Sequence, residues 1–254
     1  MSKIFLVIGA GAGVGGSVAA RFAAEGYHAV LCRRSDQQGL DRLVADIKSR
    51  GGEATGLLLD ATLDGAIEDL IEKVESEIGP IDVVLFNLGA QIGDRPLAKT
   101  SLKTFELGWR MATFALFRLA SALLPRMEER GKGTLLVTSA TAAVRGNKGQ
   151  HSHAAAMGGR RMLCQSLNAE FSPKGVHIAH VIIDGMIDAP DTVGKLLGEE
   201  RYRAIQEQMG NGKDEILVPA EIANTYFHIA RQHRSAWTHE LDLRPFTSLP
   251  WWNH

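Results

Sequence analysis

The chain has 254 residues and a formal net charge of −1, and its basic residues form no block. A nucleic acid or an anionic membrane is therefore not expected as its main partner, and the best apolar candidate for a membrane span, residues 114–124, contains Arg118. Only Cys32 and Cys164 are present, so we expect a cytoplasmic protein with reduced thiols and no disulfide framework. The length suffices for one large α/β domain with a substantial core.

The first predicted element is a strand at residues 4–8, where five consecutive apolar residues are typical of a strand buried on both faces. Four glycines follow between positions 9 and 15, and apolar residues then recur at helical spacing from Val14 to Ala23. This order of strand, glycine turn and helix is typical of a phosphate-binding site, because N–H groups at the helix start face the phosphate and glycine lets the backbone come close. An ordinary tight turn is the alternative.

Strands and helices alternate along the rest of the chain. Further strands are predicted at residues 28–32, 55–59, 81–86, 134–138, 177–183 and 241–243. Helical patterns lie at about residues 40–47, 67–74, 102–130, 152–171, 191–210 and 219–232, and Pro125 is expected to kink the longest of them. The alternation indicates βαβ units, and hence a single α/β domain over residues 1–254 with a parallel sheet and helices on both faces.

Two segments near the C-terminal end fall outside this alternation. Residues 188–212 are predicted to form a substrate lid, whose apolar side chains favour a bulky apolar or aromatic substrate. Residues 246–254, which include Trp251 and Trp252, are apolar without periodicity. We therefore expect them to pack on the body of the protein or on a partner subunit.

Charged and polar residues follow three predicted strands, at the edge where an open parallel sheet binds its ligand. Arg33 and Arg34 follow the second strand, where a carboxylate would bind the ribose hydroxyls of NAD. A guanidinium there pairs instead with a 2′-phosphate, which favours NADP; the alternative is that both arginines only cap the strand in solvent. Asp60, after the third strand, is either an acceptor for the adenine amine or a solvated loop residue. Gly89, after the fourth, permits close approach of a ribose.

Together these residues resemble the motifs of the short-chain dehydrogenases/reductases over almost the full chain. The family's T-G-x-x-x-G-x-G appears as residues 8–15, and its D-V-T, N-N-A-G and P-G segments appear as residues 60–62, 86–89 and 184–187. The resemblance implies a doubly wound, Rossmann-type sheet of about seven strands and a homodimer or homotetramer, and the arginines after the second strand favour NADP(H) as the cofactor. It implies cofactor contacts from Gly9, Ala12, Gly13, Val14, Gly15, Arg33, Arg34, Asp60, Ala61, Asn87, Leu88, Gly89 and Ile187.

The catalytic positions depart from the pattern of this family, whose members usually carry an Asn-Ser-Tyr-Lys tetrad. His153 stands where the tyrosine is expected, and Met157 stands at the position of the lysine. The asparagine position falls at Ala112, and the serine position falls at Ala140, directly after Ser139. A shift of one residue in the loop would bring Ser139 into register, but no shift restores the tyrosine.

Reduction of a carbonyl group needs a hydride donor, a proton donor and stabilisation of the developing alkoxide. His153 is the candidate proton donor, because an imidazole exchanges protons near neutral pH without a neighbouring lysine. Ser139 is the candidate hydrogen-bond donor to the carbonyl oxygen. The alternative is that His153 only fills the space of the tyrosine. No metal site is expected, because His151 and His153 have no carboxylate or thiol at a companion spacing.

Three functions fit these residues. The first is an NADPH-dependent reductase that transfers a hydride to a bulky or aryl ketone, a small-molecule carbonyl substrate. The second is a non-catalytic NADP-binding protein that acts as a sensor or partner subunit, and the third is a lyase or isomerase that uses the pocket without the hydride. The cofactor motifs favour the reductase, because positioning a hydride donor supplies much of the catalysis.

Overall fold

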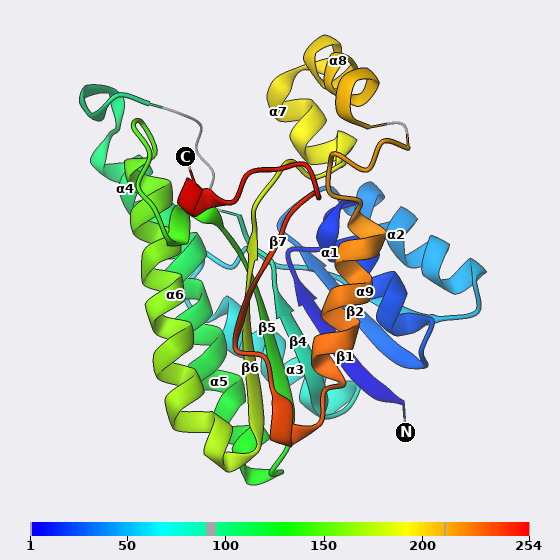
Figure 1. Ribbon diagram of the computed structural model, residues 1–254. Coiled ribbons are helices and arrows are strands. Elements are labelled where there is room, and N and C mark those ends of the chain that lie inside the picture. Colours follow the sequence, from blue (N-terminus) through cyan, green and yellow to red (C-terminus); the bar gives the residue numbers. More distant parts are fainter. Residues whose placement is uncertain (1, 90–94, 211, 254) are drawn as a thin grey trace.

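A parallel sheet of seven strands, in the order β3-β2-β1-β4-β5-β6-β7, forms the middle layer of the protein (Figure 1). The computed structural model describes residues 2–89, 95–210 and 212–253. The strands are β1 (Lys3–Ile8), β2 (Tyr27–Arg33), β3 (Glu53–Leu58), β4 (Ile81–Phe86), β5 (Gly133–Ala140), β6 (Val176–Ile183) and β7 (Glu240–Leu243). All the predicted strands are confirmed, and the strand order changes direction between β1 and β4.

Helices cover both faces of the sheet, as predicted. Helices α1, α2 and α9 lie on one face of the sheet, and helices α3, α5 and α6 lie on the other (Figure 1). The α-helices are α1 (Val14–Ala23), α2 (Gln37–Ser49), α3 (Ala66–Glu77), α4 (Leu102–Trp109), α5 (Ala115–Glu129), α6 (His151–Phe171), α7 (Lys195–Leu197), α8 (Glu199–Met209) and α9 (Pro219–Ala230). This arrangement is a doubly wound, Rossmann-type fold.

Strand β1 shows why a continuous apolar run suits the centre of this sheet. Phe5 and Val7 belong to the core under α1 and α9, whereas Leu6 and Ile8 belong to the core under α3 and α5. The Phe5 ring stacks on Phe22 of α1 with the ring centres 3.9 Å apart. Each fully buried side chain of this size contributes about 1.5–3 kcal/mol, so both faces of the strand stabilise the fold.

The helix predicted over residues 102–130 is interrupted before Pro125, and the kink expected at Pro125 stays a prediction. The π-helical turn η2 (Arg110–Phe114) joins α4 to α5, and α5 continues through Pro125. Within this turn the Ala112 carbonyl accepts a hydrogen bond from Arg160 Nε of α6 at 2.9 Å. A π turn inserts an extra residue into a helix, and such turns are frequent at functional sites.

The same stretch, Leu102–Glu129, is long and apolar enough to cross a membrane by length and composition alone. However, 56% of its apolar window is buried inside the protein, as in the core helix of a soluble protein. Arg118 lies within it, is buried, and pairs with Glu68 of α3 at 2.5 Å. The packing against α3 therefore accounts for the apolar character of this stretch.

The predicted lid stands over the carboxyl ends of the strands, and the C-terminal tail returns to the same edge (Figure 1). Apart from residue 211, which lies outside the described residues, the lid over residues 188–212 consists of η5 (Pro190–Gly194), α7, α8 and short connections. In the tail, the Trp251 N–H donates to the Asp184 carboxylate at 3.1 Å, and the Trp251 carbonyl accepts a hydrogen bond from Arg145 at 3.3 Å. This part of the tail therefore packs on the body of the protein.

Candidate active site

The turn between β1 and α1 has the shape that a phosphate group needs. Gly9 has a φ of +103°, and a Cβ there would lie 2.7 Å from the Asn87 carbonyl oxygen. A Cβ on Gly15 would lie 2.3 Å from the Gly9 carbonyl oxygen, so both positions require glycine. Helix α1 begins after Gly13 without a side-chain cap. The N–H groups of its first turn can therefore bind an anion.

Asn87 connects this turn to the end of β4. Its side-chain amide donates to the Gly9 carbonyl oxygen at 2.9 Å, and its backbone N–H donates to the Ile8 carbonyl oxygen at 2.8 Å. Because β1 and β4 flank the point where the strand order changes direction, this is where a doubly wound fold binds its ligand. The predicted ribose segment Asn87-Leu88-Gly89 thus lies at the expected crevice, with the Asn87 side chain holding the turn.

Arg33 and Arg34 lie where β2 ends, at one end of the crevice. The Arg33 guanidinium contacts the Asp36 carboxylate at 3.0 Å. Asp36 also accepts a hydrogen bond from the Gly39 N–H at 2.9 Å, and this bond, with the charge of Arg33, holds the pKa of Asp36 below its usual range. Asp36 is thereby fixed as the partner of Arg33, while Arg34 is exposed.

Asp60 follows β3 and is held as a carboxylate. Its side chain accepts hydrogen bonds from the Thr62 hydroxyl at 2.6 Å and the Thr62 N–H at 3.0 Å. The hydroxyl contact is the main reason why the pKa of Asp60 lies below its ordinary value. A carboxylate is an acceptor only, as the predicted contact with the adenine amine requires.

The predicted residues come together in one cleft of about 780 Å³, a size typical of small-molecule sites. The candidate catalytic residues Ser139 and His153 line it. So do twelve predicted cofactor residues: Gly9, Gly13, Val14, Gly15, Arg33, Arg34, Asp60, Ala61, Asn87, Leu88, Gly89 and Ile187. The exception is Ala12, which is exposed in the glycine turn and is not part of the lining.

Ser139 and His153 lie away from the arginine pair, because β5 and β2 are separated in the sheet by β1 and β4. His153 is in the first turn of α6, and Met157 follows one turn later on the same face. The Met157 sulfur lies 3.9 Å from Ser139 Oγ, and both side chains are buried. The start of α6 therefore faces the end of β5, with a thioether beside the Ser139 hydroxyl.

Arg160 lines the same cleft and was not predicted from the sequence. It follows His153 by seven residues, which is close to two helical turns, so both side chains lie on one face of α6. The Arg160 side chain is only 1% exposed. The signal that could have identified it is its phase with His153 and Met157 along the predicted helix.

Apolar residues of the predicted lid line part of the cleft. Ala189, Val193 and Leu197 contribute to its lining. At the base of the lid, the Asp188 carboxylate accepts hydrogen bonds from the Tyr202 hydroxyl at 2.5 Å and from the side-chain amide of α8 residue Gln206 at 2.6 Å. These bonds tie α8 to the segment that leaves β6.

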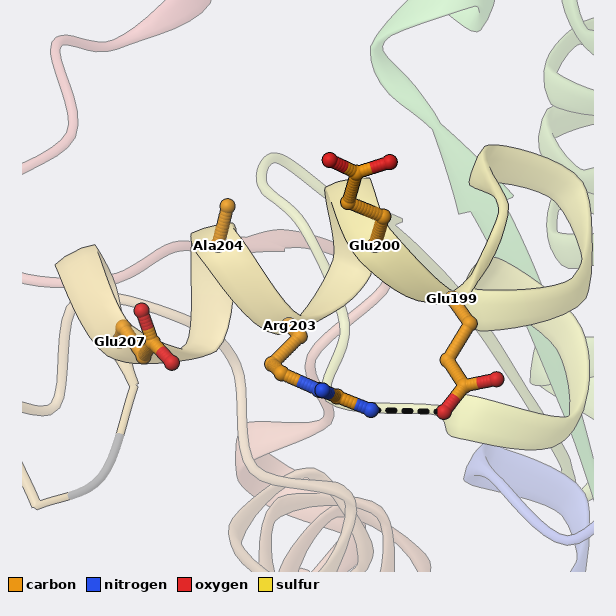
Figure 2. A pocket seen from close by; sticks show the side chains of 5 residues that line it. All are labelled: Glu199, Glu200, Arg203, Ala204 and Glu207. Carbon is orange, nitrogen blue, oxygen red and sulfur yellow. Dashed lines mark hydrogen bonds and ion pairs between the residues drawn. The ribbon is translucent and has the colours of Figure 1, made fainter.

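A second hollow, of about 470 Å³, lies along α8. Figure 2 shows Arg203 pointing toward Glu199, with which it pairs at 2.7 Å, whereas Glu200 and Ala204 point away from that pair. All its lining residues come from this one helix, and their polar groups do not converge on a common point. The main cleft is therefore the candidate active site.

Known proteins share both the sequence and the fold. Residues 3–197 match the short chain dehydrogenase family. The short-chain reductase protein NovJ from Streptomyces niveus is 31% identical over 232 residues, which cover 90% of this chain and 87% of NovJ. The crystal structure of a short-chain dehydrogenase from Rhodopseudomonas palustris has a TM-score of 0.79 and 31% identity, over 96% of this chain and 99% of that chain.

A variant of actinorhodin polyketide ketoreductase, solved with NADPH, has the same fold, with a TM-score of 0.83 and 22% identity over 96% of each chain. The chain therefore belongs to the short-chain dehydrogenase family of oxidoreductases.

Proposed function

We propose that this protein is an NADPH-dependent reductase of bulky or aryl ketones. His153 is the proton donor, and Ser139 donates a hydrogen bond to the carbonyl oxygen. The observation that carries the proposal is a single cleft that holds the glycine turn, the arginine pair and both of these side chains. The apolar lid residues favour a bulky apolar substrate, and the names of the relatives NovJ and actinorhodin ketoreductase support reduction.

The residues of the cleft fit NADPH. At Gly9 and Gly15 a Cβ would meet the carbonyl oxygens of Asn87 and Gly9, so glycine lets the turn pack closely on the end of β4. The start of α1 then offers N–H groups to a pyrophosphate. Asp36, the carboxylate close to the end of β2, is occupied by Arg33, so it is not available for a ribose. Arg34 supplies the guanidinium for a 2′-phosphate.

Reduced nicotinamide, when bound, supplies the hydride. His153 protonates the substrate oxygen as negative charge develops on it, and Ser139 stabilises that charge by donating a hydrogen bond. A positioned proton donor contributes about 10²–10⁴ to the rate. Ala189, Val193 and Leu197 cover the apolar part of the substrate.

The second candidate is a non-catalytic NADP-binding protein that acts as a sensor or partner subunit. Met157 favours it, because a buried thioether against Ser139 Oγ can neither bind a ribose hydroxyl nor assist a proton donor. Both candidates share the cofactor, so only turnover distinguishes them.

The test is a fluorescence titration with NADPH and then NADH, followed by addition of aryl ketones to the NADPH complex. The reductase requires tighter binding of NADPH and decay of its signal with a ketone, and the decay must be lost in His153→Ala. NADPH binding with a steady signal across the ketone panel would instead establish the non-catalytic candidate. Equal binding of NADH would remove the argument from Arg33 and Arg34.

A further inference from the structure

A buried cation lies beneath the catalytic end of the cleft. The Arg160 guanidinium donates hydrogen bonds to the backbone carbonyl oxygens of Leu88 at 2.7 Å, Ala112 at 2.9 Å and Thr138 at 2.6 Å. The guanidinium carbon lies 5.0 Å from the centre of the Phe86 ring. Arg160 thus binds the ends of β4 and β5 and the π-helical turn η2 to α6.

The charge of Arg160 is solvated by dipoles and is not neutralised by an acid. Among the residues that the structure describes, no carboxylate forms an ion pair with it, whereas the adjacent Arg161 pairs with both oxygens of Glu240 at 2.7 Å. Burial lowers the pKa of Arg160 to about 10, and at neutral pH the side chain is still protonated. Backbone carbonyls orient their negative ends toward the guanidinium but carry no net charge, so the cleft retains a full positive charge at its floor.

This charge stands close to the position where the family carries its lysine. His153, Met157 and Arg160 lie along one face of α6, and all three line the cleft. Met157 occupies the lysine position, and Arg160 follows it by about one helical turn. The positive charge of the site therefore lies about one helical turn beyond the family's lysine position, and it is buried.

We infer that Arg160 makes this cleft favour reduced over oxidised nicotinamide. This inference rests on the proposed function, because it requires that a nicotinamide cofactor binds in the cleft. The nicotinamide ring is neutral when reduced and carries one positive charge once it has given up a hydride. The phosphates carry the same charge in both forms, so a fixed cation near the ring changes the ratio of the two affinities through the ring alone. Arg160 thereby favours uptake of NADPH and release of NADP⁺, the direction of a reductase.

The experiment measures the Kd of NADPH and of NADP⁺ by calorimetry, without substrate, and compares the ratio Kd(NADP⁺)/Kd(NADPH) among variants. Arg160→Gln keeps two amide donors but removes the charge. It is expected to lower the ratio by about tenfold, which corresponds to about 1.4 kcal/mol of lost repulsion between the guanidinium and the oxidised ring. Arg160→Lys keeps the charge and is expected to stay within about threefold of the wild type. An unchanged ratio in Arg160→Gln would overturn the inference.

A complementary variant adds a positive charge to α6 at a position that now carries an uncharged side chain. Met157→Lys places a cation on the same face of the helix, and the ratio is expected to rise. The double variant Met157→Lys/Arg160→Gln moves the charge by one turn and is expected to return the ratio toward the wild-type value. Arg126→Gln, which removes a half-buried arginine of α5 that pairs with Glu72 of α3, is the matched control and leaves the ratio unchanged.

The outcomes separate the two proposals. If circular dichroism shows that Arg160→Gln does not fold, Arg160→Lys and Met157→Lys decide, and a ratio that fails to rise in Met157→Lys overturns the inference. If NADPH and NADP⁺ both bind but all variants have the same ratio Kd(NADP⁺)/Kd(NADPH), the role of Arg160 is refuted and the proposed function is unaffected. If neither binds to the wild-type protein, the proposed function falls together with the inference.

Discussion

The two ends of the cleft are built by different means. The dinucleotide end is mostly backbone: the glycine turn, the first N–H groups of α1 and the carbonyl oxygens of Gly9 and Asn87. The catalytic end is mostly side chains of α6, namely His153, Met157 and Arg160. Backbone geometry admits few substitutions, whereas side chains on a helix face can be exchanged without moving the helix. A dinucleotide end built from backbone therefore keeps a fixed sequence signature, whereas a catalytic end built from helix side chains can vary.

The largest effect is expected from a substitution that distorts the glycine turn at the dinucleotide end of the cleft. In Gly15→Ala the new Cβ would lie 2.3 Å from the Gly9 carbonyl oxygen, so the turn must move. Loss of two charge-assisted N–H contacts, each worth about 1.5–3 kcal/mol, predicts at least about a 100-fold loss of NADPH affinity by fluorescence titration. Gly158→Ala on α6 is the control, because a Cβ there meets no atom within 4 Å. If Gly15→Ala bound NADPH with wild-type affinity, the claim that the backbone of the glycine turn binds the cofactor would be refuted.

The second-largest effect is expected at the catalytic end of the cleft, which is built from side chains of α6. His153→Ala is expected to lower kcat for ketone reduction by about 100-fold or more, because it removes the proton donor, while the Kd of NADPH stays within about twofold. Steady-state kinetics and titration measure the two quantities separately. His151→Ala, two residues earlier and outside the cleft lining, is the control and keeps wild-type kcat. A parallel loss in both variants would mean that the start of α6 is perturbed as a whole.

Acid is expected to destabilise the edge of the sheet that adjoins the catalytic end. Burial lowers the pKa of His180 on β6 from 6.5 to about 4, although its ring lies 3.0 Å from the Glu240 carboxylate on β7. Between these two values the unfolded chain binds a proton that the folded protein does not. The free energy of unfolding is therefore full above about pH 6.5 and falls by up to about 3 kcal/mol as the pH is lowered to about 4.

Urea unfolding across this pH range measures the loss, and His180→Gln should remove most of the slope. The same slope in His180→Gln and the wild type would assign the acid sensitivity to other groups, such as His177, whose pKa burial also lowers.

A smaller effect is expected at the arginine pair. Arg34→Ser removes the exposed guanidinium, and the loss of one charge-assisted contact predicts about a tenfold weaker binding of NADPH. Binding of NADH should be unchanged, because NADH lacks the 2′-phosphate. Arg50→Ser, at an exposed arginine paired with Asp46, is the matched control. Equal losses for NADPH and NADH would show that Arg34 supports the fold of the loop and does not recognise the phosphate.

The fold and the dinucleotide end could be predicted because their physical requirements are local in the sequence. A parallel strand buried on both faces needs a continuous apolar run, as at Ile4–Ile8, and a turn with φ near +103° needs glycine, as at Gly9.

The role of Arg160 could not be predicted in this way. Two adjacent arginines in a helix usually indicate a solvated face, and only Arg161 has an ion-pair partner. Burial of Arg160 depends on carbonyl oxygens supplied by three distant segments, including Ala112 in a π turn that the sequence pattern does not reveal. Asp184 is a similar case, because its carboxylate accepts a hydrogen bond from the N–H group of Trp251, which lies in the distant tail.

The strand order also determines how the sheet can assemble during synthesis. β1 is made first of the seven and receives β2 and then β3 on one side, after which β4, β5, β6 and β7 add in turn on the other side. Each new strand thus pairs with an existing edge, and none has to be inserted between two paired strands. The glycine turn and β4 can consequently be in place before the segment with Ser139 and Arg160 leaves the ribosome, so that the catalytic helix docks onto a preformed dinucleotide end.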